Sequence, residues 1–151
     1  MLHSPAIPRA GRPPERGRTY RLRHGAYAVL RRGDDVLLTR QVTEDVDELQ
    51  LPGGGIDPGE TPLRALVREL REETGYTTIV RARLGTFRIF TYMPDYGFHA
   101  EKLCHIYLAC PGLRLGPPEE AGHSAIWLPL AVAARRVASP GAQAILRKLA
   151  A

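Results

Sequence analysis

Residues 54–76, GGIDPGETPLRALVRELREETGY, predict a glycine-rich loop that leads into a helix rich in carboxylates. Three consecutive glycines at 53–55 allow backbone angles closed to other residues, and they let a ligand approach the main chain closely. Thr61 is a good N-cap, and Pro62 at the first helical position already has a φ suited to a helix. No residue breaks the helix before Gly75, which is a typical C-terminal stop. The stretch therefore predicts one helix, preceded by a loop able to hold a ligand.

At about 100° per residue, the side chains of this helix form three stripes. An apolar stripe, expected to be buried, holds Leu63, Leu66, Val67 and Leu70. An acidic stripe holds Glu69, Glu72 and Glu73, and the outward side is expected to hold Arg64, Arg68 and Arg71. Like charges at this spacing repel one another, so the acidic stripe needs a positive partner. The helical arginines are one partner, and a hard divalent cation is another, because all-oxygen ligand sets suit Mg²⁺ or Mn²⁺. For an isolated acidic cluster, a solvated helix face is the alternative interpretation.

The stretch resembles the Nudix box, G-x5-E-x7-R-E-U-x-E-E-x-G-U, in which U is a bulky aliphatic residue. The matching positions are Gly54, Glu60, Arg68, Glu69, Leu70, Glu72, Glu73 and Gly75. Tyr76 stands at the final aliphatic position, and this departure touches no ligand. The resemblance implies an α/β (α+β) fold, an α/β/α sandwich around a mixed β-sheet, over roughly residues 24–150.

Nudix enzymes hydrolyse the pyrophosphate bond of a nucleoside diphosphate linked to another group, with Mg²⁺ or Mn²⁺ as cofactor. Carried over position by position, the resemblance implies a metal site made of Glu69, Glu72, Glu73 and the backbone carbonyl of Gly53. It also implies that Arg68 orients the neighbouring carboxylates and that Glu60 supports the site from the loop. The chain is therefore expected to be an enzyme, a pyrophosphohydrolase that acts on a nucleotide-type small molecule.

The general base stays open, because Nudix enzymes vary it. Some use the first glutamate of the helix, here Glu69, and others use a glutamate on the loop before the last strand. That loop offers Glu119 and Glu120, and it is followed by Trp127. Many relatives have a glutamate about four residues before that tryptophan, where this chain has His123, a residue able to titrate near neutral pH. An inert histidine on a surface loop is the other interpretation.

The substrate is expected to be read by the second half of the chain. Residues 92–109, YMPDYGFHAEKLCHIYLA, are similar to a stretch in ADP-ribose and ADP-sugar pyrophosphatases. The candidate substrate-binding residues are Tyr92, Tyr96, Phe98 and Glu101. Tyr92 equally suggests a dinucleoside polyphosphate hydrolase. Enzymes that clear oxidised dGTP use an asparagine near the start of the last helix, where this chain offers only Gln143, so that prediction ranks lower. A module that senses a nucleotide without hydrolysis is a further alternative, although such modules usually lose a box glutamate.

The net charge of +5 lies entirely in residues 1–23, where six arginines oppose Glu15 alone, so the remaining residues balance to zero. Four prolines and two glycines make a poorly ordered tail the first expectation. The alternative is an arm that folds over the domain and attracts a polyanionic substrate or nucleic acid, which leaves an RNA 5′-pyrophosphohydrolase open but not favoured. Residues 24–151 are expected to form a single domain, and a homodimer is left open.

Composition agrees with one cytoplasmic globular domain. The chain has 151 residues, of which 44% are hydrophobic and 25% charged. No segment is apolar for long enough to cross a membrane, and the N-terminus lacks the apolar core of a signal peptide. The two cysteines, Cys104 and Cys110, are expected to be reduced. Strands are predicted at 24–30, 36–41, 77–92 (with a bend at Gly85), 98–109 and 125–128, and closing helices at 130–137 and 142–149.

Overall fold

The computed structural model describes residues 6–119 and 123–151. Over those residues the chain forms seven strands and three helices. In chain order they are β1 (Arg21–Arg32), β2 (Asp35–Val42), β3 (Asp47–Gln50), β4 (Gly53–Gly55), α1 (Pro62–Thr74), β5 (Tyr76–Met93), β6 (Phe98–Arg114), β7 (His123–Pro129), α2 (Leu130–Arg136) and α3 (Pro140–Ala150). None of the helices among the described residues has the length and apolar character needed to cross a membrane.

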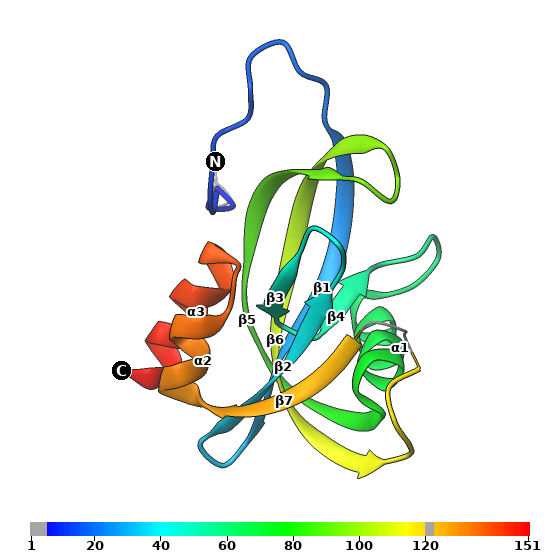
Figure 1. Cartoon of the computed structure of the whole chain (residues 1–151), viewed down its shortest axis with the longest axis vertical. Helices are drawn as coiled ribbons and strands as arrows, with labels where there is room; N and C mark the ends of the chain where they lie inside the picture. The colour runs from blue at the N-terminus through cyan, green and yellow to red at the C-terminus, as the bar shows by residue number, and fades with distance from the viewer. Residues whose placement is uncertain (1–5, 120–122) are drawn as a thin grey trace, which may run out of the picture.

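The strands make one mixed sheet in the order β3-β2-β1-β6-β5, in which β4 also pairs with β1 and β7 also pairs with β2. The central pair, β1 and β6, is parallel, and the other named pairs are antiparallel. Helix α1 lies on one side of the sheet, and α2 and α3 lie together on the other side (Figure 1). This arrangement confirms the expected α/β/α sandwich around a mixed sheet.

Each face of the sheet buries its own apolar cluster. On the α1 side, Leu66 and Leu70 pack with Ala26, Ala28 and Leu30 of β1. On the other side, residues of α2 and α3 pack on a larger cluster that includes Val29, Phe87 and Ile106. Because successive residues of a strand point to opposite faces, β1 contributes to both clusters and anchors both layers.

The ends of α1 follow the local sequence signals. The Thr61 hydroxyl accepts a hydrogen bond from the Arg64 N–H, and Gly75 ends the helix in a left-handed conformation with φ of 78°. The expected apolar stripe was half wrong. Leu66 and Leu70 are fully buried, but Leu63 and Val67 are 47% and 43% exposed. Since Ala65, Glu73 and Thr74 are buried instead, the buried face of the helix is rotated from the one that hydrophobicity alone indicates.

Strands β5 and β6 form a long hairpin with register shifts near Gly85, which agrees with the predicted bend. Strand β6 is longer than expected, because it continues past residue 109 through Pro111 to Arg114. Burial raises the pKa of the Cys104 thiol in β6 to about 11, and both cysteines are free. The hairpin and the start of β1 extend beyond the other strands at one end of the molecule (Figure 1).

The segment before β1 forms an arm at that same end of the molecule (Figure 1). Ala10 N–H donates to the Arg88 carbonyl at 2.8 Å, and Arg88 N–H donates to the Pro8 carbonyl at 2.9 Å, so the arm adds a short parallel bridge to the edge of β5. Further along, the Tyr20 ring packs edge-on against Phe90, with 5.0 Å between centroids. The sheet begins at Arg21, three residues before the predicted start of the domain.

Candidate active site

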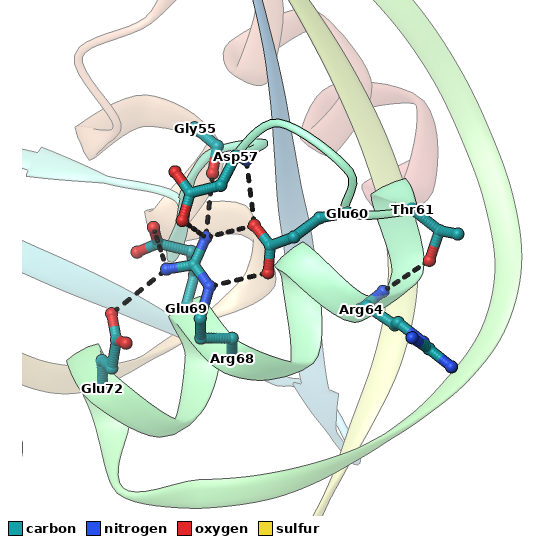
Figure 2. Close-up of polar contacts among 8 residues, drawn as sticks. All are labelled: Gly55, Asp57, Glu60, Thr61, Arg64, Arg68, Glu69 and Glu72. Carbon is teal, nitrogen blue, oxygen red and sulfur yellow. Dashed lines mark hydrogen bonds and ion pairs between the residues drawn. The ribbon is translucent and has the colours of Figure 1, made fainter.

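The guanidinium of Arg68 lies at the centre of the acidic cluster, which corrects its predicted outward position (Figure 2). It contacts four carboxylates and one main-chain carbonyl. These contacts are Glu60 at 2.8 and 2.9 Å, Glu69 at 3.0 Å, Glu72 at 3.4 Å, Asp57 at 3.4 Å and the Gly55 carbonyl at 3.1 Å. Only a planar fork with several N–H donors can serve this many oxygens at once, and this geometry favours arginine over lysine.

The carboxylate of Glu60 has a strongly lowered pKa. The Arg68 side chain and then the Asp57 N–H donate to its oxygens and lower its pKa to about 2. The same hydrogen bonds to Glu60, together with those to Glu69, raise the pKa of Arg68 above its ordinary value. Glu60 is therefore ionised throughout the physiological range, and it ties the loop to the helix.

The glycines before the helix are required by close contacts. Gly53 has φ of 143°, and a Cβ there would lie 2.2 Å from the Ala26 carbonyl oxygen. Its N–H donates to the buried carboxylate of Glu73 at 2.9 Å. A Cβ on Gly54 would lie 2.6 Å from Cδ of Glu69, so the Glu69 carboxylate rests directly against the loop backbone. The loop thus positions two of the three box glutamates.

Glu69 faces a cavity of about 120 Å³ between the loop and the sheet. The cavity is lined by Arg23, His24, Gly25, Tyr27, Gly55, Asp57, Glu69, Met93, Tyr96 and Lys102. It therefore joins acidic groups from the loop and helix to cationic groups from β1 and β6. Sequence reasoning missed Arg23 and His24, because only the pairing of β1 with β4 and β6 brings them to Glu69. A smaller cavity of about 60 Å³ shares Tyr27 and Lys102 and extends towards α3.

The ring of His24 is held by a second histidine. Its Nδ1 lies 3.1 Å from Nε2 of His105, and the ring planes are within 7° of each other. The ring centroids are 5.4 Å apart, which is too far for stacked faces. That distance fits two rings lying side by side, joined through the two nitrogens. Burial, then the neighbouring His24 and Arg83, lower the pKa of His105.

The four predicted substrate-binding residues separate onto two faces of the hairpin. Tyr96 lines the cavity, and its ring contacts that of Phe98 at 5.7 Å between centroids. Tyr92 pairs across the hairpin with His99, and Glu101 is ion-paired with Arg88 at 3.1 Å. Residues 98 and 101 are three apart along one strand, so their side chains point to opposite faces. The structure thus brings Tyr96 and Phe98 towards Glu69, and it places Tyr92 and Glu101 on the other side.

The candidates for the general base are placed unequally. Glu119 lies beside α1, where its N–H donates to the Glu72 carbonyl at 2.8 Å and its side chain lines an open groove with Arg68 and Glu72. Glu120 and the side chain of His123 fall outside the described part of the chain. Gln143 donates to the Val137 carbonyl at 2.8 Å, so its amide is used within the fold. Among the candidates for the general base in the described part of the chain, Glu69 lines the cavity.

The donors around the cavity suit a hard divalent cation in chemistry. They are the Glu69 carboxylate and the carbonyls of the glycine loop, and Glu72 lies next to the cavity, where it shares Arg68 with Glu69. All of these donors are oxygen, and Mg²⁺ typically takes one or two carboxylates together with substrate phosphates. The missing Cβ of Gly54 leaves the space in which Glu69 meets the loop backbone. Among residues 6–119 and 123–151, no three histidine, cysteine or acidic side chains converge on one point. The site therefore fits an ion held partly by the main chain and the substrate.

Comparison with known proteins shows that the resemblance to the Nudix family covers most of the chain. Residues 21–149 match the model of the NUDIX domain family. An 8-oxo-(d)GTP phosphatase of Mycolicibacterium smegmatis is 31% identical over 102 residues, 68% of this chain and 30% of that protein. An ADP-ribose pyrophosphatase of Bacillus subtilis is 32% identical over 89 residues, 56% of this chain and 45% of that protein. The matched segments thus span less than half the length of either relative.

A NUDIX hydrolase structure from Nitrosomonas europaea has a similar overall shape. Its TM-score to this chain is 0.70 at 19% identity, covering 84% of this chain and 87% of that one, and at this identity the likeness concerns the fold. The box positions, the sandwich architecture and the family match agree with one another. The chain belongs to the NUDIX domain family.

Proposed function

We propose that this protein hydrolyses the pyrophosphate bond of a nucleoside diphosphate linked to another group, with Mg²⁺ or Mn²⁺. The observation that carries the proposal is the shared cavity of Glu69, Arg23 and Lys102, in which an acid suited to a cation or a proton faces two cations suited to phosphates. A divalent ion, when bound, would neutralise phosphate charge and polarise the bond that breaks. Glu69, Glu72 and the Gly53 carbonyl would hold it, and Glu73 would fix Gly53 through its N–H.

In this proposal, a water oxygen forms a bond to one phosphorus while the bridging P–O bond breaks. The Glu69 carboxylate accepts the proton of that water, and the leaving phosphate departs with the bonding electrons. Arg68 and Glu60 act as positioning residues, because they hold the carboxylate of Glu69 and the loop without lining the cavity themselves. Arg23 and Lys102 bind the phosphate oxygens and keep the substrate's charge from repelling the attacking water.

Within this reaction class, ADP-ribose and other ADP-sugars are the first substrates to test. The placement of Tyr96 and Phe98 supports this choice, whereas the ion pair of Glu101 with Arg88 takes one residue of the ADP-sugar pattern out of the site. The apolar cavity that continues from Lys102 towards α3 offers room for part of a base or sugar. The smegmatis relative makes 8-oxo-dGTP the second substrate to test.

The test is product analysis with each divalent ion in turn. ADP-ribose, another ADP-sugar, a dinucleoside polyphosphate, dGTP and 8-oxo-dGTP are each incubated with the protein and with a Glu69→Gln variant prepared in parallel. Cation-dependent release of a nucleoside monophosphate, abolished in the variant, is the expected result. If none of these substrates is cleaved while one of them raises the melting temperature, the protein is a nucleotide sensor and the proposal fails.

A further inference from the structure

We propose that Tyr27 is a positioning residue, which holds the ammonium of Lys102 against the phosphate next to the nucleoside. The inference rests on the proposed function, since it takes a nucleotide as the ligand of the Glu69 cavity. It gives Tyr27 a role in that reaction, and it assigns Lys102 to one particular phosphate of the substrate.

Among the described residues, Tyr27 and Lys102 are the two that line both cavities. The cavity of Glu69 holds the candidate acid and the cations. The smaller cavity is mainly apolar, and its walls include Leu51, Phe87, Ile89, Ile106 and Ala142. A cation at the junction of a polar and an apolar cavity suits the point at which a nucleoside is joined to its first phosphate.

The ring of Tyr27 is held in place by two glycines. A Cβ on Gly25 would lie 2.7 Å from a ring carbon and 3.0 Å from the hydroxyl oxygen of Tyr27, so the ring lies directly over the backbone of Gly25. A Cβ on Gly53 would lie 2.9 Å from Cδ1 of the same ring. The backbones of β1 and the glycine loop therefore fix the position of the Tyr27 hydroxyl.

The side chain of Lys102 lies against this ring. Its ammonium is 5.7 Å from the centroid of the Tyr27 ring, within the range of a cation–π contact, and it also interacts with the hydroxyl. Burial raises the pKa of the Tyr27 phenol although Lys102 opposes that change, so the phenol is neutral and its oxygen can accept from the ammonium. An ammonium has three N–H donors, so Tyr27 leaves two of them for a phosphate.

Arg23 occupies a different part of the polar cavity. Arg23 and Lys102 are partners in the register of β1 and β6, but their charged ends diverge. The guanidinium of Arg23 lies 4.9 Å from the centroid of the Tyr96 ring, and a Cβ on Gly55 would lie 3.3 Å from it. Lys102 is thus the cation next to the apolar cavity, and Arg23 is placed for a phosphate further from the nucleoside.

Binding is measured by isothermal titration calorimetry with the full chain in EDTA, so that the result does not depend on hydrolysis. The ligands are AMP, ADP, dGMP and dGDP. Lys102→Met should weaken binding of the monophosphates and the diphosphates alike by about 10-fold, and Tyr27→Phe, which keeps the ring, by about 5-fold. In the double variant, Tyr27→Phe should add nothing to the effect of Lys102→Met, because the hydroxyl acts through the ammonium.

Kinetics and a matched variant make the result specific. On the best substrate, both single variants should raise KM by similar factors and leave kcat nearly unchanged, as expected when an interaction is lost equally from the ground state and the transition state. Tyr107→Phe removes a hydroxyl from a ring that packs on the α1 side of the sheet, and it should leave binding unchanged.

Four results would overturn the inference. The first is that the effects of Tyr27→Phe and Lys102→Met add in the double variant. The second is that Tyr27→Phe lowers stability in urea without changing nucleotide affinity. The third is that the variants weaken binding of the diphosphates but not of the monophosphates, which would assign Lys102 to an outer phosphate. The fourth is that the wild type binds none of the four nucleotides.

Hydrolysis separates this inference from the proposed function. Cleavage of a substrate without coupling between Tyr27 and Lys102 leaves the proposed function standing and removes the positioning role of Tyr27. Coupled loss of nucleotide affinity without cleavage of any substrate supports the positioning role and removes the proposed function.

Discussion

The loop and helix of residues 53–75 and the hairpin of β5 and β6 are built on different principles. In the first, contacts join residues close in sequence, such as Arg68 to Glu60 and Glu69, and the spacing itself sets the geometry. In the second, the pairing of two long strands decides which side chains reach the cavity. A one-residue shift would exchange Phe98 and Lys102 for their neighbours on the other face. The acidic cluster is therefore fixed locally, whereas the side chains that the hairpin brings to the cavity depend on long-range register.

The largest effect is expected from the acidic cluster. Glu69→Gln keeps the shape of the side chain but removes the proposed proton acceptor, so kcat should fall about 10²- to 10⁴-fold. Steady-state kinetics on the best substrate measures this effect. Glu44→Gln, on an exposed loop, is the matched control and should behave as wild type. Wild-type turnover by Glu69→Gln would show that the reaction does not depend on this helix.

The glycine loop allows a more precise comparison, because replacing either of two adjacent glycines with alanine should impair the protein in a different way. Gly53→Ala would drive a Cβ into the backbone of β1, so it should lower the free energy of unfolding by about 3 kcal/mol or more. Gly54→Ala would first meet the carboxylate of Glu69, the end of a flexible side chain, so it should reduce kcat more than stability. Gly59→Ala, with φ of 84° and open space around the Cβ, is the control for backbone strain alone, at about 1 kcal/mol. Urea unfolding and kinetics on all three variants measure the difference, and equal activity losses would contradict it.

A smaller effect should appear in acid. The folded pKa of Glu60 is about 2, below its ordinary value of 4.5. Its contribution to stability is therefore fully present above pH 4.5 and is lost as the pH falls towards 2. Wild-type melting temperatures should decline across that window, and Glu60→Gln should be less stable at pH 7 with a shallower decline. Parallel slopes for the two proteins would mean that Glu60 titrates normally.

The smallest effect concerns the far face of the hairpin. Tyr92→Ala and Glu101→Gln should change KM less than Tyr96→Ala does, because their side chains lie away from the cavity. For Tyr92, which is 51% exposed, the effect on stability should stay near 0.5 kcal/mol, the usual range for exposed positions. A large KM change for Tyr92→Ala with none for Tyr96→Ala would reverse the assignment of the two faces.

The sequence predicted the parts of the site that depend on short spacing. Thr61, Pro62 and Gly75 set the helix ends through local backbone preferences. The spacing of the box predicted that Glu69 and Glu72 lie close together on α1. Leu63 and Val67 were predicted to be buried but are exposed, because the strands beneath α1, rather than hydrophobicity, decide which turn of the helix is covered. Arg23 carries no local signal, and Lys102 offers from sequence either a phosphate contact or a lysine that keeps a strand edge soluble. Both reach the cavity only through the parallel pairing of β1 with β6, which no spacing along the chain reveals.

For enzyme engineering, the close contact of Gly53 with β1 has a practical consequence. The loop backbone lies against the main chain at Ala26 and Tyr27 with no side chain between them, so a library that varies these two positions would also move the glycine loop. The tip of the hairpin meets the cavity of Glu69 through Met93 and Tyr96, which leaves most of its outer face available for randomisation. Directed evolution towards new substrates should therefore start at the hairpin tip and leave β1 unchanged.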